Sequence, residues 1–380
     1  MSWPLRDAVR RSWAGSETGV LKSAIPTVTL SVRDRFADAV LRFRQMGSTF
    51  YGILSEGVVA DEAILALADE AAPGQPSTHL LFGAVQFLLF EQPDEPLARY
   101  YPSIADAPRD AHAAYPAFRA FCLENRARIA ELLKTRTVQT TVVRRSAYLL
   151  PAMAHLAGLL GAPFSIVEVG SSAGLLTLFD HYRYDFGDGV PIGPDGPLVS
   201  GFSYLGTKPV PAQMPQIRER IGIDLNPVDP NDLAEVRWID AVLPADLVED
   251  RRQLRAALAY RAKTPLKVIA GDALKVLPEV LAALPDPVCV FHSHCLYQWP
   301  EAAKDAFEQL LAEASRTRNI YRIGIEHFTG GGQPAPPSVL GGHPLIHDIR
   351  LMTYRKGEVA TEILGHYDGW GRNGVWLATR

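Results

Sequence analysis

The fold is decided by residues 166–176, which read Ile166-Val-Glu-Val-Gly-Ser-Ser-Ala-Gly-Leu-Leu176. An apolar strand ends around the acid Glu168, a turn opens at Gly170, and a helix is expected to begin at Gly174. Turns of this kind in open α/β sheets present a helix N-terminus and free backbone N–H groups to a nucleotide-like ligand. The order Glu-x-Gly-x-x-x-Gly differs from the Gly-x-Gly-x-x-Gly of dinucleotide-binding proteins. An ordinary tight connection between strand and helix is the alternative.

Strands alternate with helices from residue 164 onward, which predicts a parallel sheet. We expect strands at 164–169, 220–225, 266–269, 288–291 and 320–325. Helices are expected at 174–182, 233–238, 251–261, 274–283 and 302–314. The end of the chain, 360–377, has two strand-like runs around a glycine-rich turn, which predicts an antiparallel pair on the sheet edge. Two segments rich in Gly and Pro are harder to assign: 185–215 is an inserted loop or a small ribbon, and 329–344 a loop over the ligand edge.

The first 160 residues have helical patterning instead. Helices are expected at 32–46, 62–68, 80–90, 116–133 and 148–160. The sequence therefore predicts an all-α domain over residues 1–160, followed by an α/β domain over residues 161–380. The helical domain would form a lid and one wall of the pocket.

Composition restricts the class of protein. Of 380 residues, 47% are hydrophobic and 21% charged, which is ordinary for a soluble globular protein. The net charge of −4 argues against general nucleic-acid binding. The three cysteines have no zinc-like spacing and favour a reducing compartment. The longest apolar run, 80–90, is about half of what a bilayer crossing needs, so we expect a cytoplasmic protein without a membrane partner.

Two further acids follow strands of the predicted sheet. Asp224 ends the second strand, where an acid can accept both hydroxyls of a ribose; its alternative role is an Asx turn or helix cap before Pro227. Asp272 ends the third strand, where it could accept from an adenine amino group; its alternative role is to cap the next helix. With Glu168, three acids stand at successive strand ends on one edge of the sheet, and together they favour a bound ligand.

The fourth strand ends in Cys289-Val-Phe-His-Ser-His-Cys-Leu-Tyr-Gln-Trp299. His292 and His294 would share a face if the strand continued, and with Tyr297 they are the candidate proton acceptors. Polar residues bonded to loop backbone are an equally good interpretation of either histidine. Zinc is a third possibility, although the spacing fits no standard site; its further ligands would be Cys295, Glu326 and His327.

Two arginines, Arg144 and Arg145, precede the last helix of the first domain. Their guanidinium groups could bind a carboxylate or a phosphate. They could equally be a solvated helix start that pairs with acids.

These motifs resemble those of class I S-adenosylmethionine-dependent methyltransferases, at 168–174, 222–227, 271–272 and 291–294. More closely, the whole chain resembles a bacterial family of unknown function, domain-of-unknown-function family 2332, in Val138-Gln-Thr140, in Asp180-His-Tyr-Arg-Tyr184 and in its terminal hairpin. The resemblance implies a Rossmann-like methyltransferase fold and S-adenosylmethionine as cofactor. It implies that the methionine part lies against Glu168, Gly170, Ser171 and Gly174, the ribose against Asp224, and the adenine against Asp272.

The chain departs from these patterns in three places. Ser172 stands where a central glycine is usual, which restricts close backbone approach. Gln139-Thr-Thr-Val142 replaces the Gln-Thr-Asn-Glu of the bacterial family. Position 292 lacks the Asp/Asn-Pro-Pro-aromatic signature of enzymes that methylate adenine or exocyclic amines, which argues against such substrates.

We therefore expect methyl transfer to an unidentified small molecule. The alternatives are a non-catalytic protein that binds an adenosyl ligand or a protein partner, and a metal-assisted hydrolase. Fold resemblance by itself does not establish chemistry.

Overall fold

The computed structural model describes residues 30–326, 339–340, 343–344 and 347–378. Residues Val32–Arg380 belong to one compact unit. Every regular element assigned between residues 30 and 163 is a helix. The α-helices are α2 (Val32–Gln45), α3 (Thr49–Val59), α4 (Glu62–Ala68), α5 (Ser77–Leu89), α6 (Tyr115–Glu124), α7 (Arg126–Thr135) and α8 (Ser146–Leu160). The 3₁₀ helices are η1 (Pro96–Tyr100), η2 (Ala111–Ala113) and η3 (Val143–Arg145).

Four of the five predicted helices in this region correspond to α2, α4, α5 and α8, and their ends agree with the prediction to within three residues. Two features differ from the prediction. The helix expected over 116–133 is two helices, α6 and α7, which meet at Asn125. Helix α3 was not predicted. It carries two glycines and is buried on most sides, so its sequence has no clear amphipathic period. Gly57 in α3 faces the ring of Tyr115 so closely that a Cβ there would lie 2.1 Å from it.

The α/β region is built on a nine-stranded, mostly parallel sheet with the order β4-β13-β12-β11-β8-β7-β1-β5-β6. The five neighbouring strands at one end of the sheet, β6-β5-β1-β7-β8, are mutually parallel. In chain order they read 3-2-1-4-5, so the direction of winding reverses between β1 and β7. The strands are β1 (Phe164–Val169), β4 (Ser203–Leu205), β5 (Ile217–Asp224), β6 (Lys267–Ala270), β7 (Val288–Ser293), β8 (Ile320–Glu326), β11 (His347–Arg355), β12 (Glu358–Tyr367) and β13 (Asn373–Trp376).

All five parallel strands were predicted, and the antiparallel end of the sheet was predicted only in part. The terminal pair β12 and β13 is antiparallel, as expected. Strand β11, which pairs with both β8 and β12, was missed because buried charged residues such as Asp348 and Arg350 interrupt its apolar pattern. The edge strand at the antiparallel end of the sheet is β4, which comes from the segment 185–215 and not from the terminal pair. That segment also contributes to a small ribbon of β2 (Arg183–Tyr184) and β3 (Leu198–Val199).

The loop predicted over 329–344 lies mainly outside the described residues. Within it, β9 (Val339–Leu340) and β10 (His343–Pro344) form an antiparallel pair.

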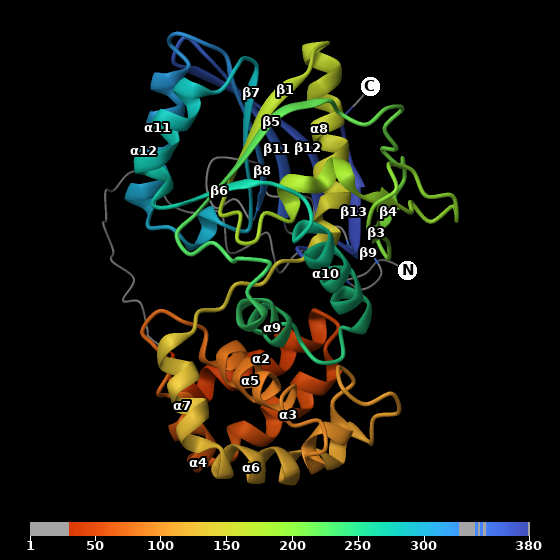
Figure 1. Cartoon of the computed structure of the whole chain (residues 1–380), viewed down its shortest axis with the longest axis vertical. Helices are drawn as coiled ribbons and strands as arrows, with labels where there is room; N and C mark the ends of the chain where they lie inside the picture. Colours follow the sequence, from red (N-terminus) through yellow and green to blue (C-terminus); the bar gives the residue numbers. More distant parts are fainter. Residues whose placement is uncertain (1–29, 327–338, 341–342, 345–346, 379–380) are drawn as a thin grey trace, which may run out of the picture. The chain divides into compact units, whose positions relative to one another are not determined.

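Helices cover both faces of the sheet (Figure 1). One face packs against α11 (Ala273–Ala283) and α12 (Glu301–Ala314). The other packs against α8, α10 (Val248–Arg261) and the 3₁₀ helix η4 (Leu176–His181). Helix α9 (Leu233–Ala241) joins the core of α2–α7 through Trp238 and Ala241. Packing therefore crosses residue 160 in both directions, and the domain boundary there stays a prediction.

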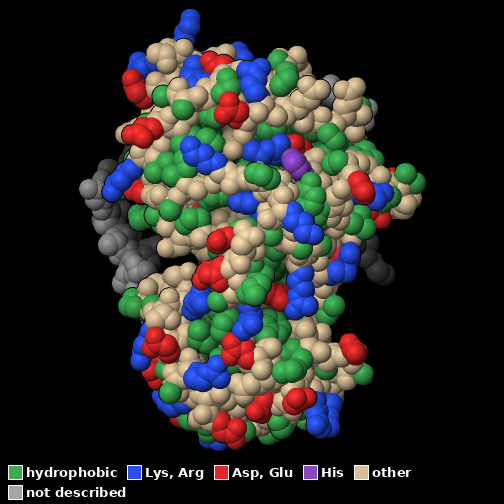
Figure 2. Space-filling view, in the orientation of Figure 1, with side chains coloured by type: hydrophobic (Ala, Val, Ile, Leu, Met, Phe, Trp, Pro, Cys, Tyr) green, Lys and Arg blue, Asp and Glu red, His purple; other side chains and the backbone are tan. Residues whose placement is uncertain are grey.

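The surface of the described residues carries charges of both signs. On the face drawn in Figure 2, acidic and basic side chains are interspersed, which agrees with the small net charge of −4. Among the helices of the described residues, none has the length and apolar character to cross a membrane.

Candidate functional site

The predicted site residues lie along the carboxyl edge of the parallel strands. Strand register aligns the ends of these strands: Val169 pairs with Ile223 on one side and with His292 on the other. Asp224 pairs with Ala270, so the loops that follow β5 and β6 are neighbours. The point where the winding reverses, between β1 and β7, is where open α/β sheets bind ligands.

The turn after β1 is tight, but an α-helix does not follow it. Gly170 and Gly174 have φ of 78° and 75°, and Ser172 has φ of 51°, a left-handed conformation that costs a non-glycine residue about 1 kcal/mol. The helix predicted at 174–182 is the 3₁₀ helix η4, which is interrupted at Leu178. The helix N-terminus expected beside the turn is therefore missing, and with it the dipole that favours an anion.

Most of the backbone N–H groups in this turn are already bonded, contrary to the prediction that they are free. The amides of Gly170 and Ser171 donate to the carbonyl of Ile223 (2.8 and 3.2 Å). Ser172 N donates to Asp224 Oδ2 (2.7 Å), and Gly174 N donates to the carbonyl of Ser171 (2.7 Å). The side-chain hydroxyls of Ser171 and Ser172, in contrast, are buried without a hydrogen-bond partner. These two buried hydroxyls are thus the side-chain polar groups of the turn whose hydrogen-bonding capacity is unused.

Asp224 and Asp272 both bond to backbone amides, in the turn and the helix cap that the sequence offered as alternatives to ligand binding. Asp224 Oδ1 accepts from Asn226 N (2.8 Å) in an Asx turn, and Gln139 Nε2 approaches the same oxygen at 3.5 Å. Asp272 caps α11 by accepting from Leu274 N (3.0 Å). Both carboxylates are only partly buried. Asp224 Oδ1 already has two donors, whereas Asp224 Oδ2 and Asp272 Oδ1 each accept from one and retain capacity for a second. They could still bind a ligand from these positions.

Glu168 lies beneath the turn. It is 2% exposed and accepts from the hydroxyl of Thr177, on the side of the sheet that η4 covers. Burial raises the pKa of Glu168 to about 8, and the negative charge of Asp224 adds to this increase. At neutral pH the side chain is therefore mainly a neutral acid, which is poorly suited to attract a ligand ammonium group.

His292 and Glu326 form a buried pair on the opposite face of the sheet. The Nδ1 atom of His292 lies 2.5 Å from Glu326 Oε1, and its Nε2 has no partner. Glu326 also accepts from three consecutive amides, those of Cys295 (3.0 Å), Leu296 (2.8 Å) and Tyr297 (2.7 Å). The carboxylate of Glu326 therefore fixes the loop that follows β7. Burial lowers the pKa of His292 and favours its neutral ring.

His294 lies apart from His292, so the two do not share a face. Strand β7 ends at Ser293, and His294 has φ of 52°, which redirects its side chain. Its Nε2 lies 2.7 Å from the hydroxyl of Tyr367, and its ring stacks on His347 with a centroid distance of 4.7 Å. Tyr297, 55% exposed, is edge-on to the His294 ring at 6.0 Å. Two of the three candidate proton acceptors thus meet here.

The described residues contain no group of three or more His, Cys, Asp or Glu side chains that could hold a metal ion. His327, which the sequence offered only as a possible ligand, lies outside the described residues. Of the other proposed ligands, Glu326 is engaged by His292 and by backbone amides. Cys295 packs against Gly170.

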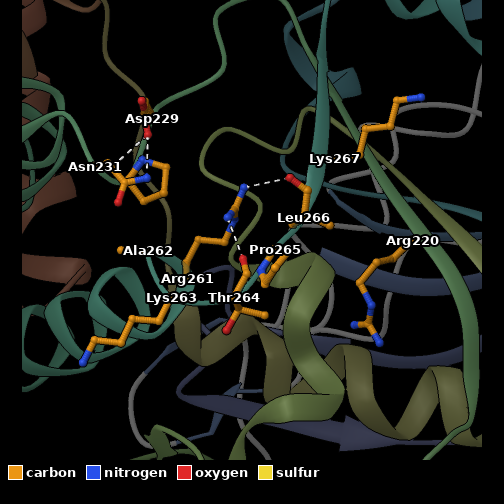
Figure 3. A pocket seen from close by; sticks show the side chains of 11 residues that line it. Arg220, Asp229, Asn231, Arg261, Ala262, Lys263, Thr264, Pro265, Leu266 and Lys267 are labelled. Carbon is orange, nitrogen blue, oxygen red and sulfur yellow. Dashed lines mark hydrogen bonds between the residues drawn. The ribbon is translucent and has the colours of Figure 1, made fainter.

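A pocket among the described residues is lined by the end of α10, the segment before β6 and the loop after β5 (Figure 3). It has a volume of about 590 Å³ and is open to solvent. Arg261 donates to the carbonyls of Ala173 (3.0 Å), Thr264 (2.9 Å) and Leu266 (3.1 Å), so it fastens α10 to the turn. Lys263 and Lys267 extend away from Arg261 in different directions, so this pocket shows no convergent set of ligand-binding groups.

Replacing Gly170 with Ala should destabilise the protein by about 1–3 kcal/mol. A Cβ at Gly170 would lie 2.4 Å from Cys295 Sγ, and the residue has positive φ. Urea unfolding measures the loss. The double variant Gly170→Ala, Cys295→Ala should recover only the part due to Sγ, because the Cβ of residue 295 would still lie 2.8 Å from the new Cβ. No recovery would show that the Sγ contact does not cause the loss.

The fold and the site define a mixed α/β protein with a polar carboxyl edge at the point where its parallel sheet changes direction. The chain belongs to the bacterial family described as "Uncharacterized protein conserved in bacteria (DUF2332)", whose sequence profile matches residues 33–376. No curated protein matches the chain. No solved structure matches it either.

Proposed function

We propose that the protein binds S-adenosylmethionine at the carboxyl edge of the sheet and transfers its methyl group to a small molecule. One observation carries the proposal: Asp224 and Asp272 stand on neighbouring strand ends, and Asp224 contacts the Gly170–Gly174 turn through Ser172 N. By resemblance to class I methyltransferases, Asp224 would accept from the ribose hydroxyls and Asp272 from the adenine amino group.

Several features of the edge fit such a ligand. The hydroxyls of Ser171 and Ser172 have no hydrogen-bond partner within the protein, and a polar ligand would satisfy them if it reached their buried positions in the turn. Gln139, from the segment before η3, donates to the carbonyl of Asn226 (2.9 Å) and so closes the loop beside Asp224. The residues that precede α8 would then contribute to the pocket wall, in the role proposed for the helical region.

The cofactor supplies a methyl group already activated by its sulfonium, so positioning of the acceptor is the main demand on the protein. His294 and Tyr297 could accept a proton from the acceptor, His294 through the Nε2 that now contacts Tyr367.

A non-catalytic adenosyl-binding or partner-binding protein is the second candidate. The observation that favours it is the internal bonding of the amides in the β1 turn, together with the burial of Glu168. Both reduce the groups with which the protein can orient the methionine part of the cofactor.

Calorimetric titration of the full chain with S-adenosylmethionine and S-adenosylhomocysteine tests the proposal. We expect micromolar binding that weakens about 10-fold to 100-fold in Asp224→Asn, because charge-assisted hydrogen bonds to the ligand are lost. Asp229→Asn is the matched control, because Asp229 makes the same Asx turn (2.9 Å to Asn231 N) five residues later. If neither ligand binds, methyl transfer is excluded; binding without turnover of any acceptor favours the second candidate.

A further inference from the structure

Arg145 is a buried cation for which the described residues supply no acidic partner. Only 7% of the residue is exposed. Its Nε donates to the carbonyl of Gly369 (2.9 Å), and it forms no ion pair with any carboxylate among the described residues. Burying a charged guanidinium is costly unless an opposite charge compensates it.

The other buried arginines of the described chain all have such a partner. Their closest nitrogen–oxygen distances lie between 2.5 and 2.7 Å. The pairs are Arg144–Asp250, Arg251–Asp240, Arg322–Glu308 and Arg350–Asp348. Arg145 is the exception among the described residues, so its charge is open to an anion that a ligand supplies.

Arg145 lies at the carboxyl edge of the sheet, where the proposed site is. It directly precedes α8, which packs along the sheet and leads through residues 161–163 into β1 (Figure 1). The N-terminal end of α8 is therefore at the same edge as the end of β1, and the helix dipole adds positive potential there.

The groups nearest to Arg145 are aromatic or already engaged. The carbonyl of Gly369 accepts from Arg145. Two residues earlier in the chain stands Tyr367, whose hydroxyl contacts His294. Burial lowers the pKa of Arg145, and the nearby Tyr367, Tyr297, Glu326 and Asp368 offset this only in part. The carboxylate of Glu326 accepts from backbone amides of the loop after β7, and that of Asp368 accepts from amides of its own loop. They do not serve as ion-pair partners of Arg145.

We propose that Arg145 binds the carboxylate of the small molecule that accepts the methyl group; this step rests on the proposed function. The Nε of Arg145 already donates to the carbonyl of Gly369. Its two terminal nitrogens can therefore bind a ligand, and end-on they match both oxygens of one carboxylate. The neighbouring cations Arg144 and Arg372 both pair with Asp250, so a single positive charge is available and a monoanion matches it. The exposed ring of Tyr297 would pack against the body of that ligand.

The test measures binding of benzoate, acetate and inorganic phosphate to the full chain at constant ionic strength, with and without saturating S-adenosylhomocysteine. We expect benzoate to bind best, and its affinity to fall at least 10-fold in Arg145→Gln while the affinity for S-adenosylhomocysteine is unchanged. Arg316→Gln, at an exposed arginine paired with Glu313, is the control that keeps benzoate binding.

Other outcomes overturn the assignment in distinguishable ways. Loss of S-adenosylhomocysteine binding in Arg145→Gln would show that Arg145 holds the carboxylate of the cofactor. Preference for phosphate over benzoate, or equal binding by wild type and variant, would refute a carboxylate site. If benzoate binds through Arg145 although neither adenosyl ligand binds, the anion site stands and methyl transfer fails.

A second measurement separates ligand binding from a structural role. Without benzoate, Arg145→Gln should keep a melting temperature within about 2 °C of wild type, because no ion pair is broken. Arg251→Gln, which breaks the pair with Asp240, should melt considerably lower. Arg145→Lys keeps the charge but not the paired nitrogens, so it should fold and bind benzoate weakly. If Arg145→Gln is as unstable as Arg251→Gln, Arg145 is a structural residue.

Discussion

Replacing Glu168 with Gln should raise the free energy of unfolding at pH 9 by about 3–5 kcal/mol. Burial raises the pKa of Glu168 to about 8 from a usual value of 4.5. Because the unfolded chain ionises at the lower pH, wild-type stability should fall as the pH rises from about 5 to 8, and this loss continues until the folded state also ionises. Gln cannot ionise, and its carbonyl oxygen can still accept from the hydroxyl of Thr177.

Urea unfolding of both proteins between pH 5 and pH 9 measures this effect. The difference in stability should be small at pH 5 and grow with pH. Glu219→Gln, at an exposed acid in β5, is the control and should show no such growth. A difference between Glu168→Gln and wild type that stays constant over this range would mean that Glu168 is ionised in the folded protein. That result would contradict the conclusion that Glu168 is a neutral acid beneath the turn.

The parallel strands could be predicted because their signal is local. Strand β1, for example, is buried along its whole length and reads as an apolar run that ends at the glycine turn. Parallel strands align their carboxyl ends, so the predicted edge followed directly from the order of elements. The helix after the turn could not be predicted in the same way, because the 3₁₀ geometry of η4 depends on contacts with α8 and β5.

The environment of each site residue depends on contacts that are distant in sequence. Sequence separations of 224 residues between Arg145 and Gly369, and of 73 between His294 and Tyr367, leave no periodic signal. The sequence indicated that Arg144 and Arg145 could bind an anion, but it could not show that Arg145 has no acidic partner among the described residues. Asp224 and Asp272 lie at strand ends as predicted, and the cap of α11 by Asp272 was one of its two expected roles. The bond from Ser172 N to Asp224, in contrast, became visible only in the structure.

Glu326 illustrates the same limit, since the sequence raised it only as a possible ligand of a zinc site with no standard spacing, and the structure gives it a different role. Its carboxylate bonds to three successive amides of the β7 loop, which carries His294 and Tyr297. The loop in turn places Cys295 against Gly170. Glu326 therefore positions the groups on one side of the proposed site without facing that site itself.

Replacing Glu326 with Gln should lower the free energy of unfolding at pH 7 by about 3–5 kcal/mol. The amide group of Gln would present a donor where the carboxylate accepts from three backbone amides and from His292. Burial favours the neutral acid, but His292 and the amides outweigh it and hold the pKa of Glu326 below its usual value. Glu326 therefore stabilises the protein above the pKa of the unfolded state, and this contribution is lost as the pH falls.

Hydrogen exchange gives the local readout that a general loss of stability would not. The amides of residues 295–297 should exchange much faster in Glu326→Gln, even under conditions where the amides of the β1 core keep their protection. Glu313→Gln, at a glutamate whose side chain is 71% exposed, is the control and should change stability by less than about 1 kcal/mol. If exchange at 295–297 does not change relative to the core, the loop is held by packing of Leu296 and Cys295, and His294 and Tyr297 are positioned without Glu326.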